Sequence, residues 1–169
     1  PTGYFHRVAS LAALQYHPAG FDVGGRRLMG RQAAGEAVLR AWVRHSGADQ
    51  ALCWAEQPDH AKEFERRVHA IDPALPTDWS RADRTGPLAA AGALWLAGPQ
   101  IGPPAWLRRR GPQNRWSVVG ITHTTASHLA MDAIADLLIA PLQPWDALIC
   151  TSNAVAATVA QVLDMQREY

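Results

Sequence analysis

The chain has 169 residues and a formal net charge of +1; 48% of its residues are hydrophobic and 18% are charged. This length suits one domain with a substantial core, and the composition is that of a globular protein and not of a disordered one. The near-zero net charge gives no electrostatic case for nucleic acid or an anionic membrane as the main partner. Lys62 is the only lysine, which excludes a Walker-type phosphate-binding loop.

The sequence contains no apolar stretch of about 18 residues, so we expect no transmembrane segment. Its N-terminal residues also lack the pattern of a signal peptide, and we therefore expect a cytoplasmic protein. Cys53 and Cys150 lie within the apolar runs ALCWA and ALICTS. We expect both to be reduced thiols buried in strands and not a disulfide.

Apolar periodicity and turn-forming residues predict the elements of the first half. In chain order these are a strand or short helix over 4–16, a glycine-rich loop over 17–30, a helix over 31–47, a strand over 48–56, an exposed helix over 58–71, and a loop with room for a short strand over 72–86. The helix over 31–47 is indicated by Ala34, Val38 and Ala41 at helical spacing, and Gly47 follows its basic last turn.

The second half continues the alternation. It comprises a strand over 92–99, a surface excursion over 101–115 with no regular element longer than a turn or two, a strand over 116–123, a helix over 126–139, a strand over 145–150 and a helix over 151–166. We expect the arginine run 108–110 to be a solvated loop or an interaction surface, and Ser152 to cap the last helix. Alternating strands and helices predict one Rossmann-like α/β domain over 1–169, an open, mostly parallel sheet with helices on both faces.

Ligands of such sheets bind beyond the carboxyl ends of the strands, where helix N-termini also point. One candidate there is the segment GGRRLMGRQAAGEA, over 24–37. Its glycines allow close approach of a ligand, and Arg26, Arg27 and Arg31 add positive charge for a phosphate or carboxylate. The spacing is not GxGxxG, so a dinucleotide fingerprint is absent, and a solvated turn remains an open alternative.

A second candidate is His123 in the segment THTT, over 122–125. At the end of a strand its imidazole can donate a hydrogen bond or move a proton, and Thr124, Thr125 or Ser127 can cap the helix that follows. A hydrogen-bonded turn residue without function is the alternative that the chemistry leaves open. His123, His128 and Asp132 lack the spacing of a zinc motif, so we predict no metal site.

Three segments together resemble the N-terminal domain of retaining glycosyltransferases of the GT-B fold, in the glycosyltransferase family 4 and glycogen-synthase-like group. They are GRQAAGEAVLRAW, GITHTTASHLAMDAI and WDALICTSNAVAATV, and both their order and their spacing match. In that group a glycine-rich loop precedes the first long helix and a histidine follows a central strand. A strand that begins with Asp then leads into the last helices of the domain.

The resemblance implies two Rossmann-like domains that face each other across a cleft. The N-terminal domain holds a carbohydrate or small-molecule acceptor, the C-terminal domain holds a nucleotide-sugar donor, and no metal or other cofactor is needed. Gly30, Arg31, Gly35 and Thr124 would then lie near the donor phosphates or the acceptor. His123 would reach the transferred sugar and act in catalysis.

The family's donor-binding domain, with its Glu-x7-Glu motif, is absent from these 169 residues. We therefore expect a fragment of a longer enzyme that is inactive alone. A stand-alone Rossmann-like module that binds a nucleotide or phosphate ligand without catalysis is the main alternative. An interaction domain that uses residues 99–115 is another.

Overall fold

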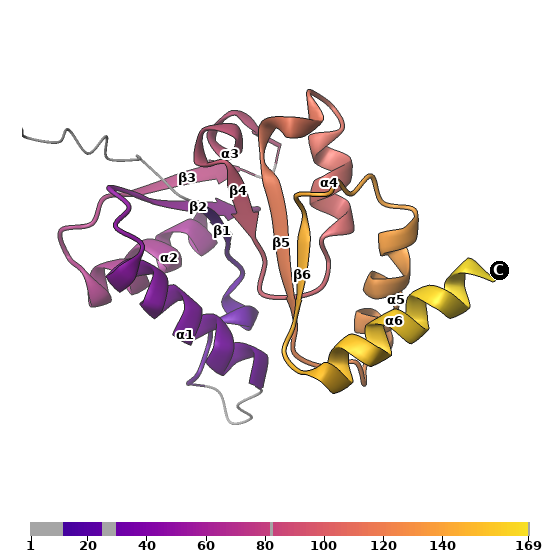
Figure 1. The fold of residues 1–169 in the computed structure, drawn as a ribbon. Coiled ribbons are helices and arrows are strands. Elements are labelled where there is room, and N and C mark those ends of the chain that lie inside the picture. The colour runs from indigo at the N-terminus through magenta and orange to yellow at the C-terminus, as the bar shows by residue number, and fades with distance from the viewer. Residues whose placement is uncertain (1–11, 25–29, 82, 169) are drawn as a thin grey trace, which may run out of the picture.

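The computed structural model describes residues 12–24, 30–81 and 83–168. Its centre is a six-stranded parallel sheet in the order β3-β2-β1-β4-β5-β6, with helices on both faces (Figure 1). The strands are β1 (Ala13–Gln15), β2 (Ala51–Ala55), β3 (Thr77–Arg81), β4 (Ala93–Trp95), β5 (Ser117–Thr122) and β6 (Ala147–Cys150). The predicted Rossmann-like α/β fold is confirmed.

Two long helices, α1 (Gly30–His45) and α2 (Pro58–Ile71), cover one face of the first three strands. The buried residues on this face come from both layers: Leu14, Tyr16, Leu39, Val43, Ala51, Cys53, Phe64 and Val68. Both helices match their predictions. The strand within 4–16 is β1, although residues 4–11 of that prediction lie outside the described residues.

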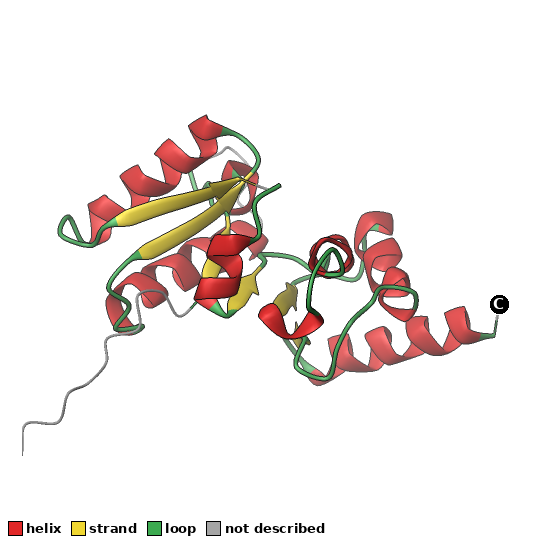
Figure 2. Cartoon of the chain, turned by 90° about the horizontal axis from the view of Figure 1, so that it is seen from above, coloured by secondary structure: helices red, strands yellow, loops and turns green. Residues whose placement is uncertain are grey.

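The other helices lie mainly on the opposite face, as the view from above shows (Figure 2). They are α3 (Gly86–Ala91), α4 (Gly102–Arg108), α5 (His128–Ala135) and α6 (Asn153–Arg167), with a 3-10 turn, η3 (Asp136–Leu138), after α5. The sequence did not predict α3, because six residues, GPLAAA, give too little periodicity. The two turns of α4 stay within the length predicted for 101–115, but the prediction of a surface excursion is wrong, because Ile101, Pro104 and Ala105 are buried against the sheet. No helix in the described ranges is long and apolar enough to cross a bilayer.

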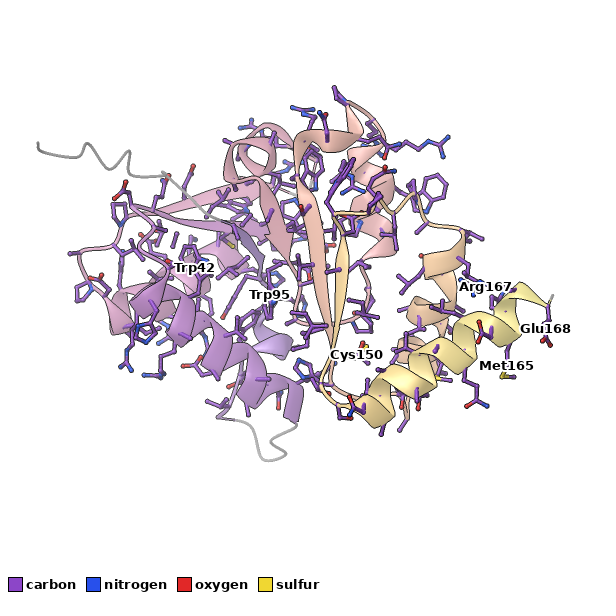
Figure 3. The ribbon with its side chains drawn as sticks, viewed as in Figure 1. Trp42, Trp95, Cys150, Met165, Arg167 and Glu168 are labelled. Carbon is purple, nitrogen blue, oxygen red and sulfur yellow. The ribbon has the colours of Figure 1, made fainter. Side chains whose placement is uncertain are left out.

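The cysteines are both free thiols. Cys53 is buried in β2, where burial raises its pKa to about 12, so the thiol is uncharged at neutral pH. Cys150 ends the edge strand β6 and is only half-buried (Figure 3). The prediction of buried thiols is therefore confirmed for Cys53 and too strong for Cys150, because an edge strand has a neighbour on one side only.

Arg108 is completely buried, so the prediction of a solvated arginine at this position is wrong. Its two terminal nitrogens each lie 2.6 Å from one carboxylate oxygen of Asp146, and both groups are almost inaccessible to solvent. The guanidinium also donates to the carbonyl oxygens of Trp116 and Pro141. The pattern of the arginine run could not reveal that a carboxylate distant in sequence would pair with its first member.

The Asp146 carboxylate is shared among three parts of the chain. Besides Arg108 at the end of α4, it accepts the backbone N–H groups of Val118 in β5 and Gln143 in the loop before β6. Charge-assisted hydrogen bonds of this kind are stronger than neutral ones, and the two charged side chains are almost inaccessible to solvent. This ion pair therefore fixes α4, β5 and the start of β6 relative to one another.

Replacing Asp146 by Asn should destabilise the protein by about 3–5 kcal/mol, because Arg108 is then left as a buried charge without a counter-ion. Urea unfolding followed by far-UV circular dichroism measures this loss. The matched control is Asp164→Asn, which removes the exposed Asp164–Arg167 pair and should cost less than about 1 kcal/mol. Equal losses in the two variants would contradict the role given to Asp146.

Gly35 lies where α1 crosses the short 3-10 turn η1 (Pro18–Gly20), and a Cβ atom there would collide with the carbonyl oxygen of Gly20. We expect Gly35→Ala to destabilise the protein by about 1–3 kcal/mol through this overlap, despite the better helix propensity of alanine. Gly30→Ala is the control, because nothing lies within 4 Å of its Cβ position. Thermal unfolding of both variants tests the difference, and an unchanged midpoint for Gly35→Ala would refute it.

Candidate functional site

The strand order reverses between β1 and β4, which are neighbours in the sheet. After β1 the chain passes to α1 on one face, and after β4 it passes to α4 on the other (Figure 1). The two connections therefore part at the carboxyl ends of these strands. Such a switch point is where open α/β sheets form their ligand crevice.

Two hollows meet at this point. The first, of about 130 Å³, is lined by Arg31, Ala97, Gly98, Pro99, Gln100, His123, Thr124, Ser127, Leu129 and Ala130. The second, of about 170 Å³, is lined by Gln15, His17, Ala19, Gly20, Phe21, Arg31, Ala97, Gly98 and Gln100. Because Arg31, Gly98 and Gln100 belong to both, we treat the two hollows as one site and call it the switch-point crevice.

The polar segment after β5 is held in place by its own hydroxyls. Ser127 is the N-cap of α5, and its side chain accepts the backbone N–H of Ala130 at 3.3 Å. Thr124 accepts the N–H of Ala126 at 3.1 Å, which fixes the turn between the strand and the helix. Capping by this cluster is thus confirmed, with Ser127 in the cap position, and His123 is left to face the crevice.

One ring atom of His123 lacks a hydrogen-bond partner within the described part of the chain, as does the buried hydroxyl oxygen of Thr122 before it. The Nε2 atom is buried and has no hydrogen-bond partner among the described residues. Burial lowers the pKa of the imidazole below its ordinary value of 6.5, so the neutral ring predominates at neutral pH. A neutral imidazole donates one hydrogen bond and accepts another, and a buried ring nitrogen without a partner is suited to a polar group of a ligand.

The loop after β4 forms the wall beside His123. The backbone N–H of Ile121 donates to the carbonyl oxygen of Gly98 at 3.1 Å, so this loop continues the pairing of β4 with β5. Gly120 makes the approach possible, because a Cβ atom there would overlap Gly98 and Ile101. Gly98 and Gln100 are thereby brought to the rim of the crevice.

The opposite wall carries positive charge. Arg31 lies in the first turn of α1, where the N-terminal backbone N–H groups of a helix favour an anion. Arg31 and His123 are distant in sequence, yet they line the same hollow. One wall thus offers a cation and the other a neutral imidazole, a combination suited to a ligand that carries both phosphate or carboxylate and hydroxyl groups.

The sequence-predicted site residues separate into two groups. Arg31, His123 and Thr124 line one hollow, and Gly30 precedes Arg31 at the start of α1. Gly35 lines neither hollow and serves the packing of α1 on η1. Arg26 and Arg27 lie outside the described residues.

The turn over 151–153 lines neither hollow, although it lies at the same edge of the sheet. Ser152 caps α6 by accepting the N–H of Val155, as predicted, and the Thr151 hydroxyl donates to the carbonyl oxygen of Thr122 at 3.0 Å. Within the described part of the chain, no three His, Cys, Asp or Glu side chains are grouped as metal ligands would be.

The sequence analysis missed Gln15, His17 and Gln100, which also line the crevice. His17 follows β1 closely, and its ring lies edge-on against His60, with 4.7 Å between the ring centroids. The rule that ligands bind beyond the carboxyl ends of strands would have included them. For Gln15 and His17 the pattern over 4–16 did not decide between strand and helix, whereas Gln100 follows the predicted strand over 92–99 and was within reach of the rule.

We expect His123 to titrate below pH 6.5 in the folded protein. Because the unfolded chain binds the proton more tightly, the contribution of His123 to stability falls as the pH drops below about 6.5. NMR titration of the imidazole resonances, with His123→Gln to assign the signal, measures the midpoint. A midpoint at or above the ordinary value would contradict the burial of this ring.

Comparison of the chain with protein-family models, with characterised proteins and with solved structures gives no match. The Rossmann-like assignment therefore rests on the strand order, the parallel pairing and the placement of the helices. The feature of this chain that bears on function is the switch-point crevice itself.

Proposed function

We propose that this chain is the acceptor-side domain of a GT-B glycosyltransferase, which transfers a sugar from a nucleotide-sugar to a carbohydrate or small-molecule acceptor. The observation that supports the proposal most is the meeting of Arg31 and His123 in one hollow at the switch point. The segments that carry these two residues are also those in which the sequence resembles this group of enzymes. A second domain, outside these residues, would bind the nucleotide of the donor.

The two side chains have different roles in the proposed reaction. As the glycosidic bond to the diphosphate breaks, negative charge grows on the leaving group, and Arg31 with the first N–H groups of α1 stabilises it. His123, neutral because of its burial, hydrogen-bonds a hydroxyl of the transferred sugar near the reacting carbon. Charge neutralisation then comes from the protein, so neither a metal nor a cofactor is part of the proposal.

A binding module without catalysis is the second candidate, and the position of Arg31 favours it. A cation beside a helix N-terminus binds phosphate without any help from His123. Calorimetry with UDP-glucose, ADP-glucose and GDP-mannose separates the candidates. The transferase proposal expects dissociation constants no tighter than about 1 mM for this domain alone, with its donor-binding partner missing. Micromolar binding would favour the module.

In the full-length enzyme, His123→Ala should lower kcat by about 100-fold or more and leave the KM for the donor nearly unchanged, because its interaction is strongest in the transition state. Steady-state kinetics with the nucleotide-sugar measures both constants. The control is His128→Ala, which removes an exposed histidine five positions further along the chain, outside the crevice lining. A variant at His123 with normal kcat would refute its catalytic role.

A further inference from the structure

The second hollow of the switch-point crevice has no part in the steps assigned to Arg31 and His123. It measures about 170 Å³ and shares Arg31 with the first hollow, which contains His123. Its own polar side chains include those of Gln15 and His17, at the carboxyl end of β1. The chemistry of these side chains indicates what this part of the crevice binds.

The end of β1 fixes the positions of Gln15 and His17. The backbone N–H of Tyr16 donates to the carbonyl oxygen of Trp54 at 2.9 Å, so the pairing with β2 continues past Gln15. Side chains alternate along an extended chain, and Tyr16 points into the core, where its ring packs against that of Phe21. Gln15 and His17 therefore share the other side of the chain, and both line the second hollow.

His17 can donate a hydrogen bond to a ligand. Its Nδ1 atom accepts the backbone N–H of Ala19 at 3.2 Å and caps η1, so the proton of the neutral ring is on Nε2. The edge-on contact with the ring of His60 restrains the orientation of the imidazole. A ligand oxygen can accept a hydrogen bond from this Nε2, whereas the same nitrogen cannot take up a proton.

Gln100 lies on the wall between the two hollows and lines both of them. A Cβ atom at Gly98 would overlap the side-chain oxygen of Gln100, so the carboxamide occupies the space that a larger residue at Gly98 would fill. A carboxamide both donates and accepts hydrogen bonds. Together with Gln15, the second hollow therefore contains two such groups.

Arg31 is the one fully charged side chain among the described residues that line the second hollow. The proposed function assigns its charge to the diphosphate of the donor. No Asp or Glu is among these lining residues, and their other polar side chains are two carboxamides and an imidazole. Such groups are complementary to hydroxyls, which also donate and accept, whereas a further carboxylate or phosphate would find no second cation.

We propose that the second hollow is the acceptor subsite and that the acceptor enters it with a neutral polyhydroxyl group, that of an uncharged sugar or polyol. This role depends on the proposed transferase function, to which it adds the chemical class of the acceptor. Because the hollows share a wall, an acceptor hydroxyl in the second is next to the sugar held by His123 in the first. Its oxygen bonds the anomeric carbon as the bond from that carbon to the diphosphate breaks. The electron pair of the broken bond stays on the diphosphate, which takes up the hydroxyl proton.

NMR titration of the isotope-labelled 169-residue protein, with pyrophosphate present to occupy Arg31, tests the class of ligand. The probes are glucose, galactose and mannose, each compared with its uronic acid. We expect at least one neutral sugar to shift the side-chain amide signals of Gln15 and Gln100 with millimolar affinity. Its uronic acid should bind about tenfold more weakly or worse, because the carboxylate meets no second cation.

Replacing Gln100 by Met keeps the length of the side chain but removes its hydrogen bonds, and it should weaken binding of that sugar about three- to tenfold. Gln161→Met is the matched control, because Gln161 is exposed on α6 and lines neither hollow. Circular dichroism checks that both variants are folded. Three results would overturn the proposal: no neutral sugar shifts these amides, the uronic acids bind as tightly, or the two variants bind the sugar equally.

A wrong acceptor class is distinguishable from a wrong transferase function. If a neutral sugar binds at Gln15 and Gln100 but a complete protein containing this domain transfers no sugar from UDP-, ADP- or GDP-sugars, the transferase function is refuted and the hollow is not an acceptor subsite. If that protein glycosylates an acceptor that binds through a carboxylate or phosphate, the transferase function stands and the acceptor class is overturned. Transfer to a neutral sugar or polyol, with a raised KM for this acceptor alone in Gln100→Met, supports both.

Discussion

The geometry of this protein depends on one constraint, which is that parallel neighbouring strands cannot be joined by a tight turn. Each connection has to cross over a face of the sheet, and right-handed crossovers put helices on opposite faces once the strand order runs outward in both directions. The reversal falls between β1 and β4. A crevice at their carboxyl ends follows, because α1 and α4 leave in opposite directions.

The outer half of the sheet needs a further restraint, since β6 is an edge strand with a half-exposed surface. The buried Arg108–Asp146 pair supplies it, by joining α4, β5 and the start of β6 through charge-assisted hydrogen bonds. Burying two charges is costly, so the benefit of this pair is a fixed arrangement more than net stability. His123, which directly follows β5, depends on that arrangement.

Much of this structure was predictable because its signals are local. Apolar residues at helical spacing over long segments predicted α1 and α2. Ser152, which precedes a helical pattern, was predicted to cap α6. The rule for ligands of parallel sheets predicted Arg31, His123 and Thr124 at one edge of the sheet, and all three line one hollow there. The capping hydroxyls around His123 followed from the same switch from strand to helix.

The remaining features depend on contacts between distant residues. Arg108 is the first of three consecutive arginines, and nothing in the sequence distinguishes it from the other two. Only the fold shows that Asp146 pairs with Arg108. Gly35 was assigned to a ligand on the strength of a glycine-rich segment, yet its neighbour is Gly20. His17 and Gln100 were missed because the crevice is lined by residues that follow several different strands. The sequence does not show which of these strands are neighbours in the sheet.

The central claim is that a nucleotide-sugar reacts in the switch-point crevice. If the proposed function is right, a crystal structure of the complete glycosyltransferase with a bound nucleotide-sugar tests this most directly. The account predicts the transferred sugar within hydrogen-bonding distance of His123 Nε2 and the diphosphate near Arg31 and the start of α1. A sugar bound elsewhere, with the crevice empty in an active enzyme, would contradict it.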